Sequence, residues 1–181
     1  MRGCLAATCL VAAAITPVAA QTPPLAPVPA LDLARYAGTW HEIARYPNWF
    51  QRNCAGDVTA TYSLRGDGMV GVINACRKAD GDTIRVEGVA RRPDAVRAPA
   101  KLEVRFAPDW LDWLPFVWAD YWVVDLAPDY SHVLVGEPTR EYLWILARSP
   151  RLDEATYARL LGRATALGYD PGRLVKSAGA H

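Results

Sequence analysis

Residues 58–64 read VTATYSL, and this stretch points to the class of fold. Its apolar side chains alternate with Thr and Ser, which is the period of a β-strand with one buried and one solvated face. Residues 84–91 and 101–106 repeat the alternation with charged residues on the polar face. Further stretches rich in Val, Ile, Thr, Tyr and Trp bring the expected strands to eight, namely 39–46, 58–64, 70–77, 84–91, 101–106, 121–126, 130–135 and 141–147.

The segments between these stretches carry the residues that turns require. Residues 66–68 (GDG) and 81–82 (GD) tolerate positive φ, and Pro128-Asp129 favours a chain reversal. Eight antiparallel strands in a short chain are expected to close into an up-and-down β-barrel, because closure pairs every edge strand. A two-sheet sandwich is the alternative architecture.

One α-helix is expected after the last of these strands, packed on the outside of the barrel. Asp153 suits its N-cap, apolar residues recur at helical spacing over 157–164, and Gly168 suits its C-terminal end. Residues 173–176 are expected to add one short strand. The sequence therefore predicts an all-β domain with a single C-terminal helix.

Composition excludes one class of partner. The chain has 181 residues, of which 51% are hydrophobic and 22% charged, as in a single globular domain. Its formal net charge of +1 is spread without a basic block. Binding to phosphate backbones requires a basic patch, so no nucleic-acid partner is expected.

The N-terminal residues are typical of an export signal. Residues 1–20 begin with a basic residue, continue through a short apolar run and end in small side chains, which predicts a signal peptide cleaved before Gln21. A retained anchor helix is the alternative. Residues 21–30 hold four prolines and predict an extended spacer before a domain spanning 31–181. We expect a periplasmic protein without a lipid anchor, because Cys4 and Cys9 lie too early to accept a lipid.

Removal of the signal leaves two cysteines, Cys54 and Cys76. The compartment beyond the inner membrane oxidises thiols, so we expect these two residues to form a disulfide. A redox function is the alternative, but no C-x-x-C spacing accompanies it.

Three ordered motifs resemble those of the lipocalins. They are the G-x-W formed by Gly38 and Trp40, the turn containing Asp129 and Tyr130, and the segment 142–148 (YLWILAR) that ends in Arg148. Within the family, the chain resembles bacterial outer-membrane lipoproteins of the Blc type and also apolipoprotein D. The resemblance implies a barrel whose closed base holds Trp40. A guanidinium stacked on an indole is attractive, so Arg148 is expected to join the last strand to the first.

Strand alternation predicts which side chains line the barrel interior. The expected lining is apolar with a few hydroxyl groups and suits an acyl chain; it consists of Trp144, Tyr142, Leu146, Tyr121, Tyr62, Ala60, Val58, Val72, Val86, Val104 and Tyr46. Small residues on the inward rows (Ala44, Ala60, Gly88 and Ala90) favour an open cavity, and a dry core filled by side chains is the alternative. Glu42 is an inward acid and is expected to pair with a neighbouring Arg or Tyr.

The connection 108–118 is unusually apolar for a loop, with Trp110, Leu111, Trp113, Leu114 and Phe116. At the open mouth of a barrel these side chains could enter the interfacial zone of a membrane. The alternative is that the loop folds inward and plugs the mouth.

The resemblance implies noncovalent binding, storage or transport of a fatty acid, a lysophospholipid or a similar lipid in the cell envelope. No metal-spaced or nucleophile motif is present, so neither an enzyme nor a cofactor nor a metal is expected. Residues 66–71 match G-x-G-x-x-G but join two expected strands, so they predict a hairpin rather than a dinucleotide site. The alternatives are a barrel enzyme with isomerase or epoxide-processing activity, or a haem or pigment carrier with His41 or His132 pointing inward. We expect a monomer or a weak homodimer.

Overall fold

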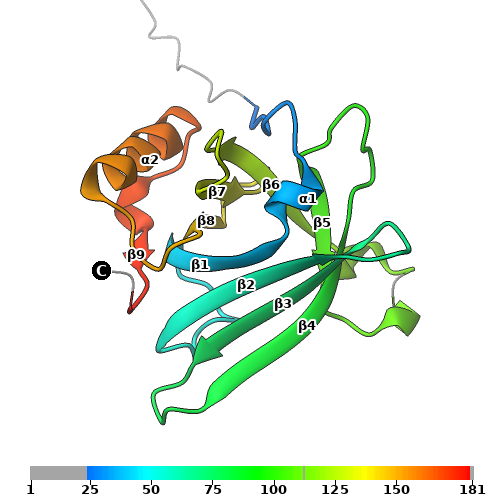
Figure 1. The fold of residues 1–181 in the computed structure, drawn as a ribbon, viewed down its shortest axis with the longest axis horizontal. Helices are drawn as coiled ribbons and strands as arrows, with labels where there is room; N and C mark the ends of the chain where they lie inside the picture. Colours follow the sequence, from blue (N-terminus) through cyan, green and yellow to red (C-terminus); the bar gives the residue numbers. More distant parts are fainter. Residues whose placement is uncertain (1–23, 112, 180–181) are drawn as a thin grey trace, which may run out of the picture.

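The computed structural model describes residues 24–111 and 113–179 and contains a closed β-barrel (Figure 1). Each strand pairs antiparallel with the next, and β1 pairs with both β2 and β8, which closes the sheet. The predicted eight-stranded up-and-down barrel is therefore confirmed, and the sandwich is excluded. The barrel strands are β1 (Gly38–Arg45), β2 (Gly56–Leu64), β3 (Val70–Arg77), β4 (Thr83–Arg91), β5 (Lys101–Arg105), β6 (Ala119–Leu126), β7 (His132–Gly136) and β8 (Leu143–Ala147).

The expected helix and the short C-terminal strand are both present. Helix α2 (Glu154–Ala166) begins where the Asp153 carboxylate accepts the Thr156 N–H at 2.8 Å. It lies beside β7, β8 and β1, away from β3 and β4 (Figure 1). Strand β9 (Val175–Lys176) pairs with β1 beyond the part of β1 that pairs with β2.

Four shorter helical segments complete the fold. Helix α1 (Leu33–Tyr36) precedes β1, and its N–H groups are capped by the Asp32 carboxylate. Two single turns, η1 (Asp109–Leu111) and η2 (Pro115–Val117), lie between β5 and β6, and η3 (Pro171–Arg173) leads into β9. No described helix is long and apolar enough to cross a membrane.

Two hydrophobic clusters hold the domain together. One fills the base of the barrel and includes Trp40, Val72 and Val133. The other lies between the barrel wall and α2 and includes Ile145 and Leu160. Strands β1, β7 and β8 are thus covered on both faces, because the interior packs on one face and the helix on the other.

Part of the expected N-terminal spacer packs against the domain. Leu25 is buried in the cluster beneath α2, and the Val28 N–H donates to the Val123 carbonyl at 2.8 Å. The chain is therefore anchored to the domain from Leu25 onward, within the segment expected to be a spacer. The predicted signal peptide, residues 1–20, lies outside the described residues.

A β-bulge in β1 corrects two predictions. Glu42 pairs with Leu146, but Ala44 pairs with Ile145, so one extra residue of β1 is accommodated between them. Alternation shifts at this point, and Ala44 and Tyr46 face α2 rather than the barrel interior. The prediction that they point inward is wrong.

The predicted disulfide is present. The sulfur atoms of Cys54 and Cys76 are bonded, and 22 residues separate the two positions. The bond joins the connection between β1 and β2 to the C-terminal end of strand β3, at the mouth of the barrel. It therefore restrains the end of the barrel that carries long loops.

Candidate functional site

The base of the barrel is sealed by the motif residues. Trp40 is fully buried, and its indole N–H donates to the Tyr36 carbonyl at 2.9 Å. The Arg148 guanidinium lies 3.9 Å from the centre of the Trp40 ring, as the sequence predicts. The first and last barrel strands are thereby joined across their seam.

Arg148 also closes the chain around α1. Its guanidinium donates to the carbonyls of Arg35, Ala37 and Thr39 at 2.7, 2.8 and 3.0 Å. Gly38 has φ of +98°, and a Cβ built there would lie 3.2 Å from an Arg148 nitrogen. Glycine at this position therefore permits both the backbone conformation and the close approach of the guanidinium.

The turn between β6 and β7 braces the same base. The Asp129 carboxylate accepts the Ser131 N–H at 3.0 Å, and the Tyr130 hydroxyl accepts the Asp32 N–H at 3.0 Å. The Arg35 guanidinium lies 4.0 Å from the centre of the Tyr130 ring. The motif residues thus have structural contacts at the closed end.

The inward-facing side chains become more exposed toward the mouth. Tyr62, Val72 and Leu146 are buried in the cluster at the base. Four other expected lining side chains are only partly covered, namely Ala60, Val104, Tyr121 and Trp144. Val86 on β4 is 45% exposed although it lies on the inner face. Interior side chains that keep accessible surface are not fully enclosed by their neighbours, which favours an open upper barrel over a filled core.

Two other expected lining residues lie elsewhere. The Tyr46 hydroxyl donates to the Asp170 carbonyl at 2.7 Å, outside the barrel. Val58 borders a hollow of about 170 Å³ between β2 and the C-terminal segment. Both residues lie near register shifts, since one occurs between Glu42 and Ala44 in β1 and another between Gly56 and Thr59 in β2.

Gly88 does not provide space for a ligand. A Cβ at this position would lie 2.6 Å from the Phe106 ring and 2.4 Å from the Arg105 carbonyl. The missing side chain is therefore replaced by the neighbouring chain, which crosses β4 closely. The inward side chains that keep accessible surface, and not the small residues, favour an open interior.

A chain of phenol groups lies on the inner face. The hydroxyl oxygens of Tyr36 and Tyr121 are 2.6 Å apart, and the Tyr62 hydroxyl donates to that of Tyr121 at 2.9 Å. Burial raises the pKa of Tyr62 to about 12 and raises the pKa values of Tyr36 and Tyr121 well above the ordinary value. These groups are neutral hydrogen-bonding partners at physiological pH.

A buried polar cluster lies between β1 and the C-terminal segment. The Glu42 carboxylate accepts hydrogen bonds from Arg45 at 2.8 Å, from Gln51 at 2.7 Å and from the Ser177 hydroxyl. Gln51 in turn accepts the indole N–H of Trp144 at 3.2 Å. Glu42 is thus paired with a neighbouring Arg, as expected, and the cluster fixes the indole of Trp144.

Aromatic rings form the upper wall around Trp144. Its indole stacks on Tyr142 with ring centres 5.8 Å apart, and Phe50 approaches both rings. Trp49 contacts Phe50 edge-on and is 72% exposed. Sequence reasoning missed Trp49 and Phe50, although an apolar pair in a connection is the same signal that identified residues 108–118.

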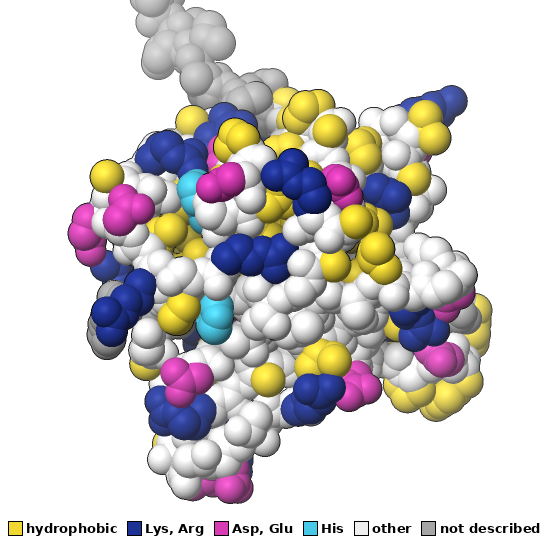
Figure 2. Space-filling view, in the orientation of Figure 1, with side chains coloured by type: hydrophobic (Ala, Val, Ile, Leu, Met, Phe, Trp, Pro, Cys, Tyr) yellow, Lys and Arg dark blue, Asp and Glu magenta, His cyan; other side chains and the backbone are white. Residues whose placement is uncertain are grey.

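The connection between β5 and β6 turns outward. Trp110, Trp113 and Phe116 are 73%, 74% and 78% exposed, and hydrophobic side chains gather over this connection in Figure 2. Leu111 and Leu114 are half-buried. The exposure of these three rings argues against the alternative in which this loop plugs the mouth.

A contact on the outer wall holds this loop in place. The buried guanidinium of Arg105 donates to the carbonyls of Ala107 and Pro108 and to the Asp109 carboxylate, at 3.0, 2.7 and 2.7 Å. Trp118, at the end of the loop, stacks on Arg91 at 4.0 Å. Both ends of the loop are thus fixed outside the barrel.

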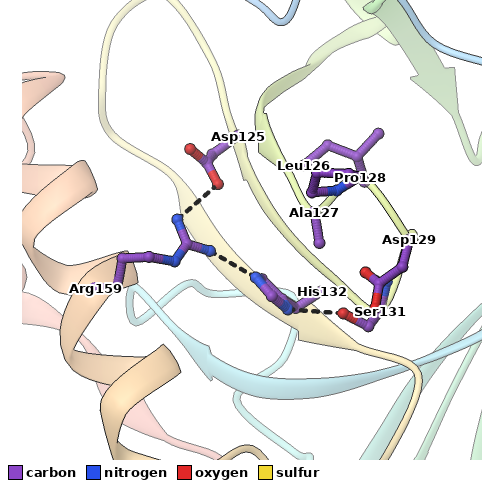
Figure 3. A pocket seen from close by; sticks show the side chains of 8 residues that line it. All are labelled: Asp125, Leu126, Ala127, Pro128, Asp129, Ser131, His132 and Arg159. Atoms are coloured by element: carbon purple, nitrogen blue, oxygen red, sulfur yellow. Dashed lines mark hydrogen bonds and ion pairs between the residues drawn. The ribbon is translucent and has the colours of Figure 1, made fainter.

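A hollow of about 460 Å³ lies between α2 and the turn that joins β6 to β7 (Figure 3). Arg159 from α2 reaches across it to Asp125 at 3.3 Å and to a ring nitrogen of His132 at 2.6 Å. His132 and His41 both pair with Ala147, whose side chain packs toward α2. Neither histidine points into the barrel, so neither could bind the iron of a haem placed there, as the haem-carrier alternative requires. His181 lies outside the described residues.

Comparison with known proteins identifies the family. The family model for the lipocalin-like domain matches residues 31–179. The chain is 42% identical to temperature-induced lipocalin-1 of Arabidopsis thaliana, over 83% of this chain and 80% of that protein. It is 40% identical to the outer membrane lipoprotein Blc of Escherichia coli, over 80% of this chain and 77% of the relative.

More distant relatives agree with this assignment. Mouse apolipoprotein D is 36% identical over 77% of this chain and 72% of its own length. The fold of insecticyanin from Manduca sexta superposes with a TM-score of 0.65 over 87% of this chain and 85% of that structure, at 21% identity. The chain belongs to the lipocalin family, whose members bind small hydrophobic molecules.

Proposed function

We propose that this lipocalin binds a lipid such as a fatty acid or a lysophospholipid, noncovalently, in the upper half of the barrel. The observation that carries the proposal is the exposure gradient, in which the base is closed and inward side chains around Trp144 remain accessible. Burial of an acyl chain against Tyr121, Val104 and Trp144 would supply most of the affinity. The proposal includes no catalytic step.

The relatives support a role in the cell envelope. The similar bacterial protein is named an outer membrane lipoprotein, and another relative is named an apolipoprotein. We propose that this chain is exported by the signal in residues 1–20 and acts in the periplasm without a lipid anchor. Acylation would be detected by intact mass spectrometry of protein from a membrane fraction, and such a result would contradict the location proposed.

The binding proposal is tested by extraction and by fluorescence. Native mass spectrometry of protein purified from the periplasm should show a bound species that solvent extraction releases as an acyl lipid. Added fatty acid should quench tryptophan fluorescence, and Trp144→Phe should remove most of the quenching. Trp122→Phe is the matched control, because Trp122 lies on the outer face of the barrel. The Lys101 Nζ atom lies 3.9 Å from the centre of the Trp122 ring. Quenching that persists in Trp144→Phe would contradict the site.

We further propose that the mouth contacts a membrane surface. Trp110, Trp113 and Phe116 on one loop and Trp49 on another are exposed around the opening. Indole rings favour the interfacial zone of a bilayer, and a loop fixed outward by Arg105 needs no rearrangement to reach it. A lipid could then pass directly between the bilayer and the barrel.

Vesicle binding tests this surface. The wild-type protein should co-sediment with vesicles of phosphatidylethanolamine and phosphatidylglycerol. The double substitution Trp110→Ser and Trp113→Ser should weaken binding by about tenfold or more, because two indole rings that would be buried in the bilayer are lost. Val96→Ser is the control, since Val96 is 91% exposed in the connection between β4 and β5 at the other end of the barrel. Equal sedimentation of the double variant and wild type would contradict membrane contact.

A further inference from the structure

The phenol chain inside the barrel has more donors than acceptors in use. Tyr36, Tyr62 and Tyr121 each carry one hydroxyl proton, and the two contacts between them use two protons. One O–H therefore has no acceptor within the chain of phenols. A buried donor without an acceptor is unfavourable, so this proton requires a partner.

The free proton is best placed on Tyr121. Tyr62 already donates to Tyr121, and Tyr36 is almost completely buried. Tyr121 is only partly covered and lies on the inner face of β6, opposite the inward-facing Leu102. If Tyr36 also donates to Tyr121, the Tyr121 proton is the one left without an acceptor among the three phenols.

An acceptor without a donor lies on the same inner wall. The side-chain oxygen of Asn74 is buried and has no hydrogen-bonding partner among the described residues. Asn74 on β3 pairs with Ala60 on β2, and Ala60 is two residues from Tyr62 on the same face. The wall beside the phenols therefore holds one unused donor and one unused acceptor.

The electrostatics of this region favour a neutral group. The raised pKa values keep all three phenols uncharged. No Lys or Arg among the described residues hydrogen bonds to a phenol oxygen of the three. A carboxylate placed there would lose its hydration without gaining a directly bonded cation.

We propose that Tyr121, assisted by the Asn74 amide on the wall, binds a neutral oxygen group at the inner end of the ligand, such as a hydroxyl group. This rests on the proposed function, in which the ligand lies in the barrel. A hydroxyl oxygen accepts the Tyr121 proton, and a hydroxyl proton can satisfy an acceptor such as Asn74. A chain that ends in a methyl group leaves both protein groups unpaired.

Two acids that differ at one atom test the proposal. Hexadecanoic acid and 16-hydroxyhexadecanoic acid have the same chain, but only the second has a hydroxyl group at the end far from the carboxylate. Their affinities for the mature protein would be measured by quenching of Trp144. We expect Tyr121→Phe to weaken binding of the hydroxy acid by about tenfold and that of hexadecanoic acid by less than about twofold.

Controls separate this inference from the proposal on which it rests. Tyr157→Phe removes a phenol of α2 itself, outside the barrel, and should change neither affinity. Asn74→Leu should also weaken the hydroxy acid selectively, which provides a second measurement if Tyr121→Phe folds poorly. An equal loss for both acids, or no loss for either, would overturn the inference. Failure of both acids to bind wild-type protein would instead overturn the proposed function.

Discussion

The base and the mouth of the barrel use the same residue types in opposite environments. At the base, Trp40 is fully buried, hydrogen-bonded and stacked against Arg148. At the mouth, Trp49 and Trp113 are largely exposed. The difference shows that tight packing at one end supplies stability, whereas the other end leaves apolar surface accessible, as the proposed binding requires.

The two ends are also held together by different means. At the base, Arg148 donates to several carbonyls around α1, and the turn containing Tyr130 packs on the same segment. At the mouth, the disulfide and the polar cluster around Glu42 connect loops that have little hydrophobic core beneath them. A barrel can thus remain open at one end because its strands are fixed at the other.

The largest effect should come from the base. Trp40→Ala should lower the free energy of unfolding by about 4 kcal/mol, because it removes a buried indole and leaves a cavity beneath Arg148. Trp113→Ala should change it by less than about 0.5 kcal/mol, because the side chain is exposed. Urea denaturation of both variants measures the difference. Similar losses in the two variants would contradict the division between the ends.

Removal of the disulfide should have the next largest effect. Replacement of Cys54 and Cys76 by Ser should cost about 3 kcal/mol, since a bond across 22 residues restrains the unfolded chain. The loss should be matched by reduction of the wild-type protein with a thiol. Denaturation of the oxidised, reduced and doubly substituted proteins checks this, and equal stability of the oxidised and reduced forms would show that the mouth does not need the crosslink.

A single methyl group at the base should have a smaller but measurable effect. Gly38→Ala should cost about 2 kcal/mol, because φ of +98° is unfavourable for alanine and the new methyl group would approach Arg148. Gly66→Ala is the matched control, because nothing lies within 4 Å of a Cβ at that position. Thermal melting would measure the midpoints of both variants. Equal midpoints for Gly38→Ala and Gly66→Ala would contradict the role of Gly38.

The smallest effect concerns pH at the outer wall. Burial, and then the charge of Arg159, lower the pKa of His132, whereas the unfolded chain binds this proton with a pKa of about 6.5. Its contribution to stability is therefore fully present above the unfolded pKa and is lost as the pH falls through 6.5 toward the folded value. His132→Gln should make stability depend less steeply on pH over this range.

Substitution of the neighbouring cation provides a check on that cause. Arg159→Met removes a charge that opposes protonation of His132, so it should also reduce the pH dependence. Melting temperatures measured between about pH 5 and 8 would reveal both changes. An unchanged slope in the two variants would assign the pH dependence to other groups.

Strand β1 shows where sequence reasoning stopped. Its first half alternates, and Trp40 and Glu42 were placed correctly on the inner face. Beyond the bulge, Ile43, Ala44 and Tyr46 are all buried beneath α2. Because both faces of this segment are covered, polar and apolar residues do not alternate, and no local pattern marks the bulge.

Two other contacts between distant parts of the chain also leave no local signal. The partners of Glu42 include Ser177, 135 residues away, and the outward direction of residues 108–118 depends on Arg105 and Trp118. An apolar loop can fold inward or outward with the same composition. Only the packing of its ends against the outer wall distinguishes the two.

The sequence by itself determined the eight strands, the outer helix, the disulfide and the Trp40–Arg148 contact, because alternation, capping residues and ordered motifs are local signals. The tertiary structure decided which wall Tyr46 and Val58 face, how far the interior is filled and where the phenol groups meet. The physical reason is that register shifts and side-chain packing depend on residues from several strands at once. The proposed ligand site of this lipocalin depends on such packing.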